Sequence, residues 1–155
     1  MAAVTISNDP CLLCELAAHR DDPGDTWVLS EDRWFAGVLP GYEAPGWVVC
    51  GMRRHGEGPD SMNPVEAAEF GVVVQRVSAA IREATGAERI YLIAFGEHFP
   101  HLHFMLVPRP PGGPDDPRGV AHLARREELR DPVRATETAN LIRSILNGSR
   151  NPEIS

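Results

Sequence analysis

The sequence predicts a single α+β domain, in which an antiparallel sheet of about five strands carries one long central helix, a short N-terminal helix and a C-terminal helical tail. Its 155 residues fit one domain, which can bury about two-thirds of its unfolded surface. Hydrophobic residues make up 43% and charged residues 24%, an ordinary globular balance. Short β-branched and aromatic runs alternate with segments of helical periodicity. We expect residues 10–110 to form the core and residues 111–155 to form a loop and a helical extension.

The N-terminal third of the chain predicts one helix and three strands. Asp9 and Pro10 supply an N-cap acid and a proline at the first helical position, so a helix is expected from residue 11 to about residue 19. Cys50 falls inside a strand rich in β-branched and aromatic residues, and a buried core thiol is the simplest interpretation of it. The expected strands are 26–30, 33–39 and 47–50.

The centre of the chain predicts the long helix. Asn63 is a suitable N-cap with Glu66 three residues later, and Gly86 is suited to end the helix. The strands 89–96 and 101–107 are joined by a short link, which favours an antiparallel pair. Apolar residues at helical spacing are expected to face the core: Ala67, Phe70, Val74, Val77 and Ile81.

The last 45 residues predict a loop followed by helices. Residues 110–114 are proline- and glycine-rich and have no core-forming power, and residues 119–129 are expected to be partly helical. A final helix is predicted over residues 132–146. Its inward residues are expected to be Leu141, Ile142, Ile145 and Leu146.

The charge of the chain restricts its partners. The net charge is -7, from 15 basic and 22 acidic residues, and every basic residue is arginine. An acidic chain is poorly suited to binding duplex DNA or an anionic membrane nonspecifically, but it can carry a cationic pocket for a small phosphate compound. The first residues resemble no secretory signal and no run is long enough to span a membrane, so we expect a cytoplasmic protein.

Three histidines crowd one segment, His98-Phe99-Pro100-His101-Leu102-His103. Side chains alternate along a strand, so His101, His103 and Met105 are expected to share one face. Leu102, Phe104 and Leu106 would then face the core. The plain alternative is a set of polar residues on a solvated sheet face.

Cys11 and Cys14 form a second motif. Residues at i and i+3 of a helix point the same way, and a helix N-terminus stabilises thiolates. The pair suits zinc, redox chemistry or neither, and redox motifs of this kind normally follow a strand, which is not expected here. Zinc needs two more ligands, and spacing alone does not choose among the histidines. The candidates are His19, His55, His98, His101, His103 and His122.

The segment from Gly96 to Arg109 resembles the signature strand of the histidine triad superfamily, His-x-His-x-His followed by apolar residues and often Pro-Arg. Cys11, Cys14 and the Arg53-Arg54-His55 turn fall where the zinc-binding branch of that family has its cysteines and its basic turn. The resemblance covers residues 10–110. It implies a homodimer, and a closed, structural zinc site formed by Cys11, Cys14, His55 and His101.

The same resemblance implies a mechanism. His103 would attack the α-phosphorus of a nucleotide-type substrate, a backbone carbonyl would hold its other ring nitrogen, and a nucleotidyl-histidine would form. His98 would serve as a hydrogen-bond donor or as proton source for the leaving group. The substrate would be a nucleoside phosphoramidate, a dinucleoside polyphosphate or a nucleotide-sugar-like ester. The expected substrate-binding residues are His98, Met105, Arg109 and Trp34. The alternatives are that Arg109 simply ends the strand in solvent, and that Trp34, like Phe35 and Trp47, is a core or dimer-contact aromatic.

The sequence departs from the family pattern at the ligand-binding positions. Met105 stands where the third histidine belongs, and Glu97 and His98 replace the usual Gln-Ser/Thr pair. Val38 takes the place of the acid that holds the ribose hydroxyls, and Trp47 replaces a histidine. The alternative function is therefore a catalytically degenerate nucleotide-binding or interaction protein with structural zinc.

A zinc nucleobase deaminase is a further alternative. Such enzymes carry His-x-Glu and then Pro-Cys-x-x-Cys. This chain has His55-Gly56-Glu57 and Pro10-Cys11 with Cys14, but in the reverse order. A deaminase keeps a water on zinc, whereas the histidine triad interpretation fills all four positions with protein ligands.

Overall fold

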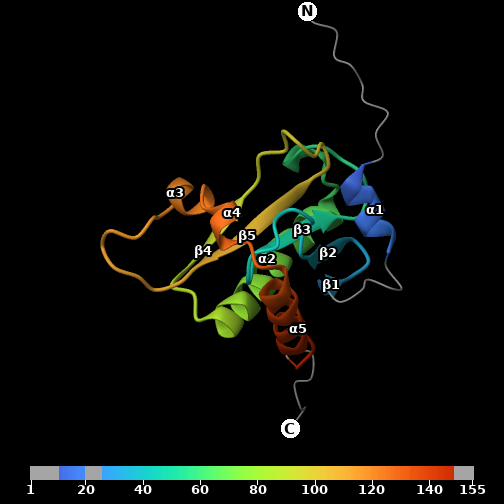
Figure 1. The fold of residues 1–155 in the computed structure, drawn as a ribbon. Helices are drawn as coiled ribbons and strands as arrows, with labels where there is room; N and C mark the ends of the chain where they lie inside the picture. The colour runs from blue at the N-terminus through green and yellow to red at the C-terminus, as the bar shows by residue number, and fades with distance from the viewer. Residues whose placement is uncertain (1–10, 20–25, 149–155) are drawn as a thin grey trace, which may run out of the picture.

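The computed structural model describes residues 11–19 and 26–148, and the expected start of the first helix at Asp9 and Pro10 lies outside them. Five strands and five α-helices follow one another along these residues, with a short 3-10 turn at Pro59–Ser61 (Figure 1). The strands are β1 Trp27–Ser30, β2 Trp34–Gly37, β3 Val48–Met52, β4 Arg89–Ile93 and β5 His103–Arg109. The helices are α1 Leu12–Ala18, α2 Pro64–Thr85, α3 Val120–Leu123, α4 Arg126–Leu129 and α5 Pro132–Gly148.

The five strands form one antiparallel sheet in the order β1-β2-β3-β5-β4. The predicted α+β fold with about five strands and a long helix is confirmed. The register places Cys50 of β3 opposite Phe104 of β5, and Gly51 opposite His103. His103 therefore begins an inner strand and pairs with β3 on one side, whereas the pairing with β4 starts at Met105.

The long helix α2 begins and ends as the sequence predicts. The Asn63 side chain accepts hydrogen bonds from the backbone of Val65 and Glu66, and the Glu66 carboxylate accepts from the Asn63 backbone. Gly86 ends the helix at φ 68°, a left-handed conformation that glycine adopts at little cost. One inward prediction was wrong: Ala67 is exposed, and the neighbouring Glu66 is buried instead, because its carboxylate pairs with Arg54.

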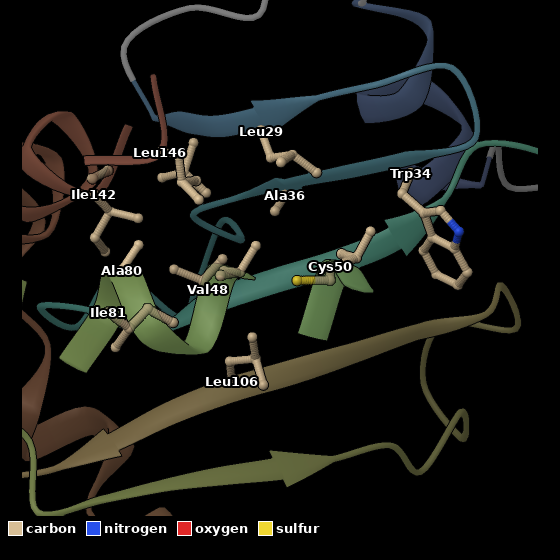
Figure 2. Packing of buried hydrophobic residues seen from close by; sticks show 14 of the residues in the cluster. Leu29, Trp34, Ala36, Val48, Cys50, Ala80, Ile81, Leu106, Ile142 and Leu146 are labelled. Carbon is tan, nitrogen blue, oxygen red and sulfur yellow. The ribbon is translucent and has the colours of Figure 1, made fainter. Parts of the chain in front are cut away.

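One face of the sheet packs against α2 and α5 (Figures 1 and 2). Alternate strand residues supply this face, and the predicted core positions Cys50, Phe104 and Leu106 belong to it. Figure 2 shows Val48, Ala80, Ile81, Ile142 and Leu146 meeting between the sheet and the two helices. The predicted inward position of Leu141 was wrong: it is 49% exposed, because Ile142 and Leu146 occupy the face of α5 that meets the sheet.

The opposite face of the sheet is covered at two places. At one place, Leu13 and Ala17 of α1 pack on Phe35 and Val49. At the other, Leu123 and Leu129 of the α3–α4 segment pack near Val107 of β5 and near Trp47, which directly precedes β3. Because both faces are covered, β2 and β3 are buried along their whole length. Among the described residues, no helix is long and apolar enough to cross a membrane.

Candidate metal centre and histidine pocket

Four side chains from three distant parts of the chain converge beside α1. Cys11 is the N-cap of α1 and Cys14 lies in its first turn, while His55 follows β3 and His101 precedes β5. Their ligand atoms all lie within 4.8 Å of one another. These are the four residues that the family resemblance implies as a metal site.

The distances within this cluster fit a tetrahedral metal. The His101 Nδ1 atom lies 3.4 Å from both the Cys11 and Cys14 Sγ atoms, and the His55 Nδ1 atom lies 3.4 Å from the Cys14 Sγ atom. Metal–sulfur and metal–nitrogen bonds of about 2.3 and 2.0 Å at tetrahedral angles place sulfur and nitrogen roughly 3.5 Å apart. Two thiolates and two imidazoles are a donor set that Zn²⁺ prefers.

The ring of His101 is oriented for metal binding by its second nitrogen. Its Nε2 donates to the carbonyl oxygen of Met52 at 2.5 Å, which leaves the Nδ1 lone pair facing the two sulfurs. Burial lowers the pKa of His101, so the ring is held neutral, as a metal ligand must be. Burial also raises the pKa of Cys14 to about 11, and the adjoining Cys11 adds to the rise. A bound cation would deprotonate such a thiol.

Two arginines fix the turn that carries His55. The Arg53 guanidinium donates to the carbonyl of Ala17 at the end of α1 and to the carbonyl of Glu31. Arg54 pairs with the buried Glu66 carboxylate through two nitrogens at 3.0 and 2.8 Å. The turn is thus tied to α1 on one side and to the start of α2 on the other.

His103 is the next histidine after the cluster. Its Nδ1 donates to the carbonyl oxygen of His101 at 2.6 Å, which assigns the proton to Nδ1 and leaves the lone pair on Nε2. His103 is half-buried, and the edge of the Phe99 ring lies against it with centroids 6.0 Å apart. The backbone carbonyl that the resemblance implied is therefore in place.

His103 lines a pocket of about 390 Å³. The predicted residues His98 and Met105 line it as well, together with Glu97 and Trp47. Its remaining walls come from the loop after β2, from β4, from the residues that follow β4 and from the α3–α4 segment. Glu97 and His98 are both exposed, so their side chains stand at the solvent side of the pocket.

Two predicted substrate-binding residues lie elsewhere. Trp34 is fully buried on the helical face of the sheet and packs against Phe70 and Phe104, so it is a core residue. Figure 2 shows it in that layer. Arg109 is 4% exposed and is bonded to Glu88 and to the carbonyl of Pro110, because it lies at the far end of β5. Arg109 lines a separate hollow and is not one of the described residues that line the pocket of His103.

Sequence reasoning missed the wall made by the C-terminal tail. Leu123, Ala124, Arg126 and Glu127 line the pocket. The Arg126 guanidinium lies over the ring of Tyr42, 4.4 Å from its centroid. No motif marks these positions, because the tail reaches the pocket only through the tertiary fold.

Comparison with solved structures identifies a common fold. A hypothetical histidine triad nucleotide-binding protein from Sulfolobus tokodaii is similar with a TM-score of 0.71 and 20% identity, over 90% of this chain and 94% of that one. A zinc-bound histidine triad family protein from Mycobacterium smegmatis gives 0.66 and 20%, over 90% and 95%. A diadenosine triphosphate hydrolase from Plasmodium falciparum, solved with cyclomarin A, gives 0.62 and 14%, over 82% and 80%.

No protein-family model matches the sequence, and no curated protein matches it. The structural likeness shows that the chain has the histidine triad fold. The family resemblance that the sequence suggested is therefore confirmed at the level of the fold, with a possible metal site at Cys11, Cys14, His55 and His101.

Proposed function

We propose that this chain is a nucleotidyl hydrolase or transferase of the histidine triad type that acts at the α-phosphate of a nucleotide ester, phosphoramidate or polyphosphate. The observation that carries the proposal is the 2.6 Å bond from His103 Nδ1 to the His101 carbonyl, in a histidine that lines a pocket of ligand size. A neutral imidazole with one nitrogen held in this way presents a free lone pair on the other.

In the proposed reaction, the lone pair on His103 Nε2 forms a bond to the α-phosphorus. The bond from phosphorus to the leaving group breaks, and the leaving group takes the electron pair. His98, which lines the same pocket, gives a proton to the leaving group. Water or another acceptor then attacks the phosphorus of the nucleotidyl-histidine, and its proton passes to His98, which gave one up in the first step. The electron pair of the phosphorus–nitrogen bond returns to Nε2.

We propose that the Cys11, Cys14, His55 and His101 cluster binds Zn²⁺ and that the ion has a structural role. Four protein ligands would leave no coordination position for water, which supports this role over a deaminase centre. Zinc would supply a rigid tie between α1 and the segment that precedes β5. His101 would then hold His103 through its own backbone carbonyl.

Three further proposals concern the assembly, the location and the partners of the chain. The likeness to histidine triad proteins supports a homodimer with joined sheets, which size-exclusion chromatography with light scattering would test. Free cysteines at the metal cluster suit a reducing compartment, so we propose a cytoplasmic location. The acidic net charge supports small phosphate compounds as partners over nucleic acids.

The test of the enzymatic proposal is to trap the covalent intermediate. The zinc-loaded chain is mixed with adenosine 5′-phosphoramidate or diadenosine triphosphate, quenched and digested, and the peptide carrying His103 is examined by mass spectrometry. An adenylyl group on His103 supports the proposal. His103→Asn should remove the adduct and lower turnover by more than about 10³-fold.

A binding protein without turnover is the second candidate, since Met105 brings no titratable group to the pocket. Such a protein would bind AMP equally well with His103 or with Asn at that position, and would form no adduct. That result would replace the enzymatic proposal with a binding function.

A further inference from the structure

The walls of the His103 pocket are mostly aromatic and aliphatic. Tyr42 lies in the loop after β2, and Trp47 directly precedes β3. Phe95 and Phe99 lie in the segment that follows β4. Leu123 of the tail completes the set. A pocket with flat apolar walls favours an occupant that has a flat apolar part, because such a group gains from leaving water and from stacking on rings.

The pocket contains one arginine among the described residues that line it, Arg126 of α4. Its guanidinium lies over the Tyr42 ring, 4.4 Å from the centroid. Tyr42 packs in one apolar cluster with Met105, and Met105 is the next residue after His103 on the same face of β5. The tail therefore places a positive charge in the same pocket as the proposed nucleophile, where the strand itself has an uncharged methionine.

The Arg126 guanidinium pairs with an exposed carboxylate, Glu127, which a ligand can displace. Its Nε and Nη2 atoms contact Glu127 Oε1 at 3.1 and 2.7 Å, but the side chains of Arg126 and Glu127 are 37% and 72% exposed. Exposed pairs of this kind contribute little, so a phosphate dianion can take over the guanidinium. The Tyr42 ring restricts the planar group to one orientation, which reduces the entropy lost on binding.

We propose that Arg126, delivered by the C-terminal tail, is a phosphate-binding specificity residue, and that the pocket takes phosphate esters that carry a flat aromatic group. The inference rests on the proposed function in placing the phosphate beside His103. It assigns to the tail the cationic recognition that the sequence suggested for Arg109. The guanidinium donates two hydrogen bonds to the phosphate while the aromatic group lies among Tyr42, Trp47 and Phe95.

The test measures binding of two ligands that differ only by the phosphate, 1-naphthyl phosphate and 1-naphthol, by titration calorimetry on the zinc-loaded full chain. Arg126→Ala should weaken the affinity for 1-naphthyl phosphate by about tenfold or more, and leave that for 1-naphthol within about twofold. Arg126→Lys should give an intermediate loss, because it keeps the charge without the planar fork.

The matched control is the neighbouring Arg125→Ala. Arg125 pairs with Glu128 and lines the separate hollow beside Arg109, so this variant should bind both ligands like the unmodified chain. Circular dichroism and thermal unfolding establish that the variants keep the fold. Equal losses in the Arg125 and Arg126 variants, or an equal loss of both ligands in Arg126→Ala, would overturn the inference.

The adduct experiment separates this inference from the proposed function. In one outcome, Arg126→Ala is adenylylated on His103 as well as the unmodified chain and binds 1-naphthyl phosphate equally tightly. That outcome would keep the enzymatic proposal and refute the role of Arg126. In the other outcome, Arg126→Ala loses affinity only for the phosphate ligand, and no adduct forms on His103 of the unmodified chain. That outcome would keep the binding role of Arg126 and refute the enzymatic function.

Discussion

The ring of His103 donates its Nδ1 proton to the backbone carbonyl of His101, 2.6 Å away, so the pocket histidine is bonded directly to a residue of the candidate metal site. His101 is bonded in turn to the Met52 carbonyl through Nε2 and faces the two cysteines through Nδ1. A single residue, His101, therefore links the candidate metal site to His103. This short connection explains how a metal can influence the pocket without touching a substrate.

The first prediction concerns the metal. Cys14→Ser should reduce the zinc content from about one ion per chain to a small fraction, and lower the free energy of unfolding by about 3 kcal/mol or more. The reason is that α1 would lose its tie to the segment before β5. Atomic absorption and urea denaturation measure the two effects. Cys50→Ala is the control, since this thiol is buried in the core, and it should keep its zinc. Full zinc in the Cys14 variant would refute the assignment.

The second prediction concerns His98. His98→Ala should slow the reaction of substrates with poor leaving groups by about 10²-fold, and have little effect on an activated p-nitrophenyl ester, which leaves without a proton. Steady-state kinetics on the two substrate classes measure the difference. Glu97→Gln, at the adjoining exposed position of the same pocket, should show no such dependence on the leaving group. A uniform loss for both classes in the His98 variant would rule out proton donation.

The third prediction separates two tryptophans. Trp34 is fully buried and packs against Phe70 and Phe104, so Trp34→Leu should lower the free energy of unfolding by about 2 to 4 kcal/mol. Ligand affinity should not change, because Trp34 lies on the helical face of the sheet. Trp47→Leu should weaken the binding of 1-naphthyl phosphate, since Trp47 lines the pocket. Denaturation and calorimetry on both variants decide the matter, and a loss of affinity in the Trp34 variant would contradict the assignment.

The fourth prediction concerns His122, whose side chain connects the C-terminal tail to β5. Its Nε2 donates to the Pro108 carbonyl at 3.2 Å, and the residue is 4% exposed, with its ring beside Trp47 and Tyr91. Burial lowers the pKa of His122, the bond to Pro108 opposes this, and the Arg125 and Arg109 charges lower the pKa further. The unfolded chain, with a pKa near 6.5, therefore binds a proton more readily.

It follows that the stabilising effect of a neutral His122 is complete above about pH 6.5 and is lost as the pH falls through the lower pKa of the folded state. His122→Gln should have a smaller loss of unfolding free energy between pH 7.5 and pH 5.5 than the unmodified chain. The contributions of the other histidines to the pH dependence cancel in this comparison, because both proteins contain them. Equal pH dependence in urea denaturation at the two pH values would show that His122 does not titrate as described.

The sequence by itself predicted every element of the sheet and both long helices, because these depend on local periods and caps. The Asn63 capping box, the Gly86 end of α2 and the inward side of β5 are readable from a few neighbouring residues. The expected strand ends differ by a few residues: β5 begins at His103, since the backbone NH of His101 bonds to the Phe99 carbonyl in a turn. The four residues of the metal cluster came from family resemblance, because spacing alone did not choose among six histidines.

The tertiary structure alone decided which charged and aromatic residues reach the pocket. Trp34 and Arg109 carry suitable chemistry, but the alternation of β2 turns Trp34 into the core and the length of β5 takes Arg109 away from His103. Arg126 lies 23 positions after His103, beyond the rest of β5, a loop and the short helix α3. The packing of Leu123 and Leu129 on the opposite face of the sheet brings it back to the pocket. The local period of a helix or strand determines on which face of that element a side chain lies. A pocket is formed by contacts between segments that are far apart in the sequence, and no local pattern indicates which of these segments meet.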